Sequence, residues 1–215
     1  MRIDTLSAIR PQLIAALLLC PMTAVWAQTT DTTPASDLEA VITTELGSFR
    51  IEFAPDKAPK HVDNFIKLAR EHYYDGSAFY RAGRAYIQGG DPLLKDPATE
   101  KKSWGQGGLD MLAPEYSDMS HLRGVISTYH SFKHKDGAQF FIMVKDTPSL
   151  DHGFSAFGRV TEGMDVVDKI TQVPHNPENG IVDNLVRIKT ITIEKKKAVV
   201  DAQKAPIGDE QKAKN

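Results

Sequence analysis

Between residues 76 and 193 the chain runs through a series of short apolar segments that are separated by glycines and other turn-forming residues. The segments cover residues 79–81, 86–88, 124–128, 139–144, 157–160 and 185–193. They are shorter than typical helices, and aromatic and β-branched residues are common in them. Many short strands joined by turns are typical of closed β structures. The sequence therefore predicts a mainly β protein.

Two other patterns add a hairpin and two helices. Residues 41–46 are rich in β-branched side chains, Gly47-Ser48 supplies a turn, and residues 49–53 alternate strictly between apolar and polar. Residues 59–73 carry apolar side chains at three-and-four spacing, and Pro59 suits the first turn of a helix. Residues 163–170 predict a second, shorter helix.

The N-terminal segment is typical of a secretory signal peptide. Arg2 and Arg10 precede an apolar run that ends at Cys20, and Val25-Trp26-Ala27 suits cleavage before Gln28. The run is shorter than the ~20 residues that span a membrane. We therefore expect residues 1–27 to be removed and the protein to be exported, with the periplasm as its compartment. A lipoprotein acylated at Cys20 is an alternative, although the bulky Leu19 before the cysteine disfavours it.

Composition divides the rest of the chain and limits its partners. Residues 28–37 are polar and aperiodic and predict a flexible linker, residues 38–195 form the domain, and residues 196–215 predict a polar, disordered tail. The formal net charge is -2. A charge this close to zero gives no general attraction to nucleic acid or to an anionic membrane. We expect a monomer that binds neither once the signal peptide is removed.

Several kinds of chemistry find no support in the sequence. There is no G-x-S-x-G nucleophile motif, no phosphate-binding loop and no dinucleotide-binding motif. His130 and His134 have a spacing that metal ligands use, but no third ligand accompanies them. We therefore expect neither a metal nor another cofactor.

Five motifs occur in a fixed order along the domain. They are Phe79-Tyr80-Arg81 with Ile87-Gln88-Gly89-Gly90-Asp91-Pro92, Arg123-Gly124-Val125-Ile126-Ser127, Gly137-Ala138-Gln139-Phe140-Phe141-Ile142, Leu150-Asp151-His152-Gly153 and Phe157-Gly158-Arg159-Val160. In this order and spacing they resemble the cyclophilin family of peptidyl-prolyl isomerases, and especially its exported bacterial members. The resemblance covers roughly residues 38–195. It implies a closed eight-stranded antiparallel β-barrel capped by two α-helices.

The resemblance also implies an activity, which is rotation about X-Pro peptide bonds without a covalent step or a cofactor. The expected partners are proline-containing peptides and unfolded exported proteins. The positions that match the family's catalytic residues are Arg81, whose guanidinium is a permanent forked donor, and Gln88. The matching substrate-binding positions are Tyr86, Tyr129, His130, Gln139, Phe141, Met143, Leu150 and Phe154.

Some of these assignments have simpler alternatives. Arg81 could be a surface arginine paired with a carboxylate such as Asp75, and Met143 and Leu150 could be ordinary core residues. The resemblance implies that Phe141 lies at the proline pocket. Because successive strand residues point to opposite faces, we then expect Phe140 to enter the barrel.

The sequence also departs from the family pattern. The segment from Arg81 to Gln88 is one residue short, so that either Tyr86 supplies the aromatic floor of the proline pocket or the pocket is partly open. Tyr129-His130 replaces a smaller Ala-Asn pair where the substrate backbone lies, and Ser149 replaces a frequent tryptophan. These changes leave a second hypothesis open, in which the domain is a non-catalytic peptide-binding or chaperone module.

Overall fold

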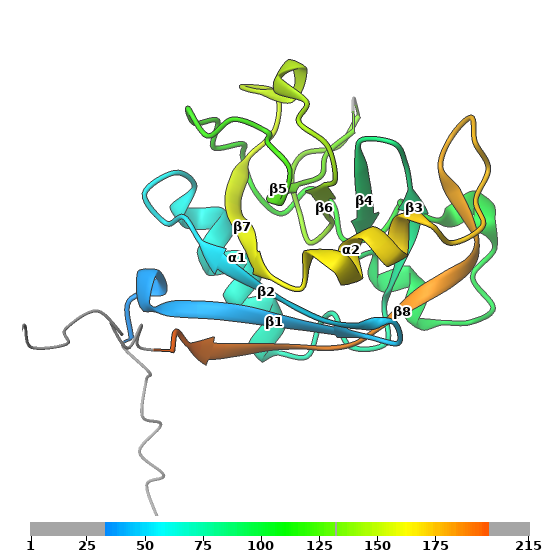
Figure 1. Cartoon of the computed structure of the whole chain (residues 1–215), viewed down its shortest axis with the longest axis horizontal. Helices are drawn as coiled ribbons and strands as arrows, with labels where there is room; N and C mark the ends of the chain where they lie inside the picture. Colours follow the sequence, from blue (N-terminus) through cyan, green and yellow to red (C-terminus); the bar gives the residue numbers. More distant parts are fainter. Residues whose placement is uncertain (1–32, 132, 198–215) are drawn as a thin grey trace, which may run out of the picture. The chain divides into compact units, whose positions relative to one another are not determined.

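The computed structural model describes residues 33–131 and 133–197 of the 215-residue chain (Figure 1). Its strands are β1 Leu38–Thr44, β2 Gly47–Phe53, β3 Ala78–Ala82, β4 Tyr86–Gly89, β5 Val125–Thr128, β6 Phe140–Met143, β7 Ala156–Glu162 and β8 Ile181–Lys195. The α-helices are α1 Pro59–Arg70 and α2 Met164–Thr171, and the 3-10 helices are η1 Ala35–Asp37, η2 Pro92–Lys95, η3 Lys101–Ser103 and η4 Pro148–Leu150.

All neighbouring strands are antiparallel, and they close in the order β1-β2-β7-β5-β6-β4-β3-β8. In Figure 1 the long strands β1, β2 and β8 lie side by side. Helix α1 packs against β7 and β8, and α2 packs against β2, β3 and β4. The predicted fold class, a closed eight-stranded antiparallel barrel with two helices, is confirmed.

The alternation of β2 shows how the sequence builds this barrel. Phe49, Ile51 and Phe53 are buried and point inward. Between them Arg50 faces outward and joins three strands, because its Nη1 lies 2.6 Å from Glu39 on β1 and 3.0 Å from Glu194 on β8. Such partly exposed ion pairs contribute at most about 1 kcal/mol each, so the inward side chains supply most of the stability.

Side chains fill the barrel interior, and aromatic rings form its centre. Phe140 contacts Phe65 of α1, Tyr74 and Phe79 of β3 edge-on, with ring centroids 5.6, 5.7 and 5.8 Å apart. Helix α1 adds Val62, Phe65, Ile66 and Ala69 to the same core, and α2 adds Val166, Val167 and Ile170. Because these side chains fill the interior, we expect any binding site for a peptide on the outer face.

Several element boundaries differ from those predicted, and two of these differences have a clear structural cause. Helix α1 ends at Arg70 rather than at Tyr73, because His72 takes a left-handed conformation with φ 56°. The N–H of Tyr73 then donates to Leu68 O and the N–H of His72 to Ala69 O, which closes the helix end. Strand β8 begins four residues earlier than expected.

The early start of β8 follows from its two partners. It pairs with β3 near its beginning and with β1 along the rest of its length. Asp183 and Asn184 are polar and interrupt the apolar pattern, so the sequence did not predict this first part of β8 as a strand.

The predicted segments outside the domain are described only in part. Residues 33–37 of the predicted linker include η1, and Lys196 and Lys197 of the predicted tail are described. The predicted signal peptide, residues 28–32 and residues 198–215 lie outside the described residues. No helix in the described part of the chain has the length and apolar character needed to cross a membrane.

Candidate active site

A row of cross-strand partners carries the two predicted catalytic residues. Arg81 of β3 is opposite Gln88 of β4, Gln88 is opposite Phe141 of β6, and Phe141 is opposite Ser127 of β5. Directly opposed residues in antiparallel strands share a face of the sheet. Phe140, which precedes Phe141 on β6, is in the barrel core. The row therefore lies on the outer face. The predicted orientations of Phe140 and Phe141 are confirmed.

Arg81 is held by uncharged groups. Its Nε donates to the backbone oxygen of Asn179 at 2.8 Å, and its Cζ lies 5.5 Å from the centre of the Tyr86 ring. Among the described residues it forms no ion pair, and the suggested partner Asp75 is bonded to His72 instead. No carboxylate among the described residues therefore offsets the positive charge of this guanidinium.

Gln88 belongs to a buried network of amides and a phenol. Its Nε2 donates to the Tyr80 hydroxyl and, at 3.3 Å, to Oε1 of Gln139. Tyr80 donates to the same oxygen of Gln139 at 2.7 Å, and Nε2 of Gln139 donates to Gly107 O. Burial raises the pKa of Tyr80 well above its ordinary value, so the phenol remains a donor. These bonds fix Gln88 through Tyr80 and Gln139.

One atom of this network has no partner. Oε1 of Gln88 is buried and accepts no hydrogen bond from the described residues. A buried acceptor left unbonded costs about 1–3 kcal/mol. A donor that reached this atom would therefore bind favourably.

Phe141 is the centre of an apolar cluster on the outer face, which we call the outer cluster. Its ring centroid lies 5.1 Å from Tyr86 and 5.1 Å from Phe154, which it meets edge-on. The side chains of the outer cluster are Val125, Phe141, Met143 and Ala156, with Ala85, Tyr86, Met119, Tyr129, Leu150 and Phe154 partly buried around them. The Tyr86 ring therefore packs against Phe141, and its role as the floor of a proline pocket stays a prediction.

The central side chains of the outer cluster are buried, and the side chains around them are partly exposed. Phe141 is only 2% exposed and Met143 is fully buried. The accessible rings are those of Tyr86, Tyr129 and Phe154, which are half-buried. A proline ring on this surface would first meet these three side chains.

The structure brings all ten predicted site residues into one region of the outer face. Six of them are in the outer cluster. His130 stacks on Phe154 with ring centroids 4.7 Å apart, Arg81 lies over Tyr86, and Gln88 and Gln139 share the Tyr80 network. Their roles in binding and catalysis remain predictions.

Three residues that the sequence analysis did not select also shape this region. Tyr80 links the two glutamines, and Met119 packs into the outer cluster. His121 stacks on Phe141 at 6.0 Å and bonds to Ser127 through Nε2. Tyr80 could have been found from its place beside Arg81 on a strand, but Met119 and His121 come from an aperiodic loop.

Two cavities border the outer cluster. One of about 410 Å³ lies between the β3–β4 turn and residues 175–180, and Arg81 and Tyr86 are part of its lining. The other, of about 390 Å³, lies on the outer side of β2 and β7, and Met119 separates it from the outer cluster.

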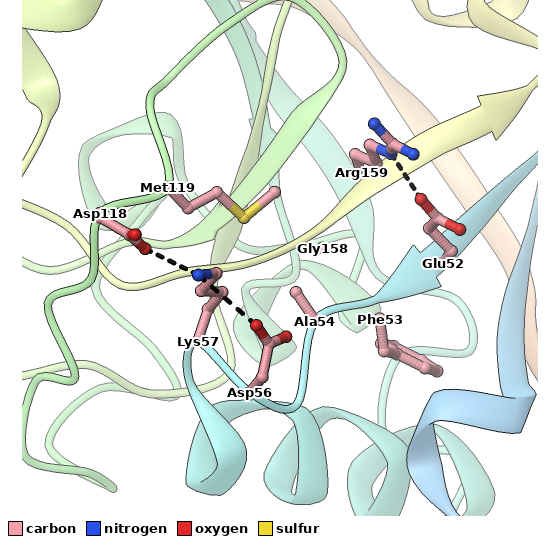
Figure 2. Close-up of a pocket in the computed structure, with 9 residues that line it drawn as sticks. All are labelled: Glu52, Phe53, Ala54, Asp56, Lys57, Asp118, Met119, Gly158 and Arg159. Atoms are coloured by element: carbon pink, nitrogen blue, oxygen red, sulfur yellow. Dashed lines mark hydrogen bonds and ion pairs between the residues drawn. The ribbon is translucent and has the colours of Figure 1, made fainter.

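In the second cavity the charged groups bind one another. Figure 2 shows Lys57 between Asp56 and Asp118, and Arg159 facing Glu52. The first cavity, which adjoins Arg81, is therefore the better extension of a peptide site.

The histidines considered as metal ligands bind carboxylates. His130 Nδ1 lies 2.8 Å from Asp136, and His134 Nδ1 lies 2.8 Å from Asp110. No group of three or more potential ligands that could hold a metal occurs among the described residues.

Comparison with known proteins decides the family. The family model described as cyclophilin-type peptidyl-prolyl cis-trans isomerase/CLD matches residues 40–193. The chain belongs to this family. The predicted enzyme class, a cyclophilin-type peptidyl-prolyl isomerase, is confirmed.

Two relatives illustrate the match. Peptidyl-prolyl cis-trans isomerase-like 3 of Gallus gallus is 32% identical over 157 residues, which cover 70% of this chain and 92% of the relative. Peptidylprolyl isomerase domain and WD repeat-containing protein 1 of Mus musculus is 35% identical over 161 residues, which cover 72% of this chain but 24% of that longer protein.

Solved structures agree with the cyclophilin fold. A Cryptosporidium parvum cyclophilin-type isomerase, crystallised in the presence of the dipeptide Ala-Pro, matches with a TM-score of 0.63 and 24% identity over 74% of this chain and 99% of its own. A cyclophilin from Hirschia baltica matches with a TM-score of 0.58 and 21% identity over 74% of each chain. At these identities the likeness concerns the fold alone.

Proposed function

We propose that this cyclophilin accelerates cis-trans rotation of X-Pro bonds in exported proteins as they fold, with Arg81 as the catalytic residue. The observation that carries the proposal is the row Arg81, Gln88 and Phe141 across three adjacent strands on the outer face. It combines a permanent cation, a fixed amide and an aromatic ring within one peptide-sized stretch.

The chemistry needs little more than this row. Rotation about an X-Pro bond is opposed by a barrier of about 18–20 kcal/mol, because amide resonance is lost in the twisted state. The proline nitrogen then regains its lone pair and accepts a hydrogen bond better than it does in the planar amide. A donor that binds this nitrogen stabilises the twisted state over both planar states, and so raises the rate.

Arg81 is placed to be that donor. Its Nε is bonded to Asn179 O, and its terminal amino groups form no hydrogen bond with the described residues. The guanidinium is thus fixed at one side and free to donate at the other. The proline ring would rest on the half-buried rings of Tyr86 and Phe154, and the buried Oε1 of Gln88 would accept a backbone N–H of the peptide.

The proposed compartment and substrates are based on residues 1–27. Their basic, apolar and small-residue pattern supports export, and we propose the periplasm as the compartment and unfolded exported proteins as the substrates. Cell fractionation and N-terminal sequencing of the full chain test this part. A chain that begins at Gln28 in the periplasmic fraction supports it, and an uncleaved chain in the cytosol refutes it.

The activity is tested with a fluorescence isomerisation assay on a panel of X-Pro peptides. We expect the chain from Gln28 to Asn215 to accelerate isomerisation and Arg81→Ala to lower kcat/KM by roughly 100-fold or more, as the loss of one transition-state donor does elsewhere. The two proteins are compared at equal folded concentration.

The low exposure of Phe141 favours a second candidate function, a peptide-binding module without turnover. If the folded protein binds X-Pro peptides but accelerates none of them, this second function replaces the first.

A further inference from the structure

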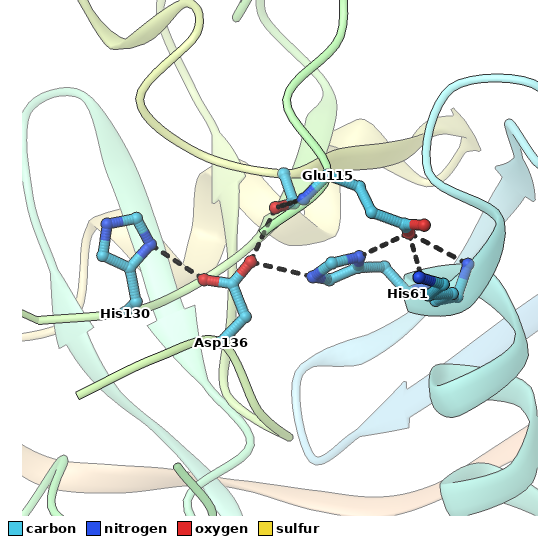
Figure 3. Close-up of polar contacts among 6 residues, drawn as sticks. His61, Glu115, His130 and Asp136 are labelled. Carbon is cyan, nitrogen blue, oxygen red and sulfur yellow. Dashed lines mark hydrogen bonds and ion pairs between the residues drawn. The ribbon is translucent and has the colours of Figure 1, made fainter. Parts of the chain in front are cut away.

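A buried polar cluster lies beneath the peptide-binding surface and takes no part in the mechanism above. Figure 3 shows His61 at the start of α1 between Glu115 and Asp136, with His130 on the far side of Asp136. The side chains of His61 and Asp136 have no exposed surface, and that of Glu115 is 17% exposed. Three chain segments that are far apart in the sequence therefore meet through charged groups.

His61 lies between two carboxylates. Its Nδ1 lies 2.8 Å from Oε2 of Glu115, and its Nε2 lies 2.8 Å from Oδ2 of Asp136. An ionised carboxylate can only accept hydrogen bonds, so a ring with a proton on both nitrogens satisfies both contacts when the two carboxylates are ionised. This geometry favours an imidazolium ion that bridges Glu115 and Asp136.

The surrounding groups support this state. Burial by itself lowers the pKa of His61, but the hydrogen bonds to Asp136 and Glu115 outweigh it, and the pKa is raised above its usual value. For Asp136 burial raises the pKa, but the bonds from His61 and Ser155 outweigh it, and the pKa is lowered. Both shifts favour the charged forms of His61 and Asp136.

Asp136 connects the buried His61 to the partly exposed His130. Its Oδ2 accepts bonds from His61 and, at 2.6 Å, from the Ser155 hydroxyl, while its Oδ1 accepts Nδ1–H of His130 at 2.8 Å. The His130 ring is 22% exposed and stacks on Phe154, which meets Phe141 edge-on. A continuous set of contacts therefore joins the start of α1 to the predicted peptide site.

We propose that His61 is a positioning residue for the peptide site, whose imidazolium holds Asp136 so that Asp136 holds His130 against Phe154. The proposal rests on the proposed function, because it assigns His130 and Phe154 to the peptide-binding surface. A buried ion pair is a weak source of stability, since packed apolar residues often stabilise a fold as well. Its specific effect here is the fixed orientation of the His130 ring.

The first test is the histidine NMR spectrum of the folded protein. We expect His61 to show two slowly exchanging ring N–H protons at pH 7 and the signals of His130 to shift in the His61→Gln variant. A singly protonated His61, or an unchanged His130 in the variant, overturns the proposal. This spectrum does not depend on turnover, so its result is separate from success or failure of the proposed isomerase activity.

The second test is a double-mutant cycle with an X-Pro peptide, read out as both KM and kcat, or as Kd if turnover is absent. We expect His61→Gln to lower kcat/KM, or to raise Kd, by about 3- to 30-fold, which lies within the range of couplings between contacting residues. His130→Phe keeps an aromatic ring on Phe154 but removes the link to Asp136. In that background His61→Gln should have no further effect.

A core variant provides the matched control. Ile42→Val removes one methylene from the fully buried interior of β1, outside this cluster, and lowers stability without altering the peptide site. It should leave KM and Kd unchanged. If Ile42→Val weakens peptide binding as much as His61→Gln does, or if the effects of His61→Gln and His130→Phe simply add, His61 acts through stability alone and the proposal fails.

Discussion

The neighbours Phe140 and Phe141 offer a test of the whole assignment of inner and outer faces. Phe140 is 1% exposed and meets three aromatic rings edge-on in the barrel core, while Phe141 faces the outer cluster. Replacing Phe140 by Ala removes a large buried ring and leaves a cavity. Such substitutions lower the free energy of unfolding by about 3–5 kcal/mol.

A domain of this size typically loses about 2–4 °C in Tm for each kcal/mol. The Phe140→Ala variant should therefore melt roughly 6–20 °C below the parent protein. Since total stabilities are about 5–15 kcal/mol, part of the population stays folded at 15 °C. Within that folded population we expect kcat/KM to stay within about 2-fold of the parent value, because no part of Phe140 faces the peptide site.

Phe141→Ala is the matched variant, since it removes the same ring one position along the strand. It should lower kcat/KM of the folded protein by about 10-fold or more, because it removes the ring on which Tyr86 and Phe154 pack. Urea denaturation supplies the stabilities and the isomerisation assay supplies the rates. A Phe140→Ala protein of unchanged stability, or one that is folded but inactive, would refute the assignment of faces.

Three further predictions concern other parts of the domain. Gly163 has φ 79°, and an added Cβ would lie 2.6 Å from Ser48 O, so Gly163→Ala should cost about 1–3 kcal/mol of unfolding free energy in urea titrations. Hydrogen bonds from the Ser120 hydroxyl and the backbone N–H of His121 lower the pKa of Asp151 to about 2. Its contribution to stability should therefore be complete above the usual carboxyl pKa of 3.8 and be lost as the pH falls towards 2, and Asp151→Asn should remove this dependence from urea midpoints. Tyr80→Phe leaves Gln88 and Gln139 without their shared hydroxyl, and it should lower the unfolding free energy by about 1–3 kcal/mol and reduce kcat/KM in the isomerisation assay.

Periodic patterns in the sequence predicted most of the strands and the alternation of their side chains, and the family resemblance added the closed barrel. The alternation of residues 49–53 located the inner side chains of β2, and the same rule separated Phe140 from Phe141. The two-residue period of a strand holds wherever one face is buried, so these predictions needed no tertiary information. The end of α1 was predicted less well, because the left-handed residue His72 ends the helix. The start of β8 was also missed, because the strand changes its pairing partner from β3 to β1.

The residues that surround the site were harder to predict, because many of them come from loops without a period. His121 reaches Ser127 and Phe141, and Asp136 reaches His61, only because the folded barrel brings these segments together. Neither contact has a signal in local sequence. The resemblance to cyclophilins located Arg81, Gln88 and Phe141. It also selected Tyr86, Tyr129 and His130, where this chain differs from the family, but it gave no partners for their side chains.

Those differences are nevertheless linked in the structure. The β3–β4 turn places the Tyr86 ring both near the Arg81 guanidinium and against Phe141. His130, which stands where the family pattern has a smaller residue, bonds to Asp136 and stacks on Phe154. Tyr86 and His130 thus each have two defined partners. A surface built in this way is ordered before the peptide arrives, so less conformational entropy is lost on binding, and this favours a site that discriminates among the residues flanking proline.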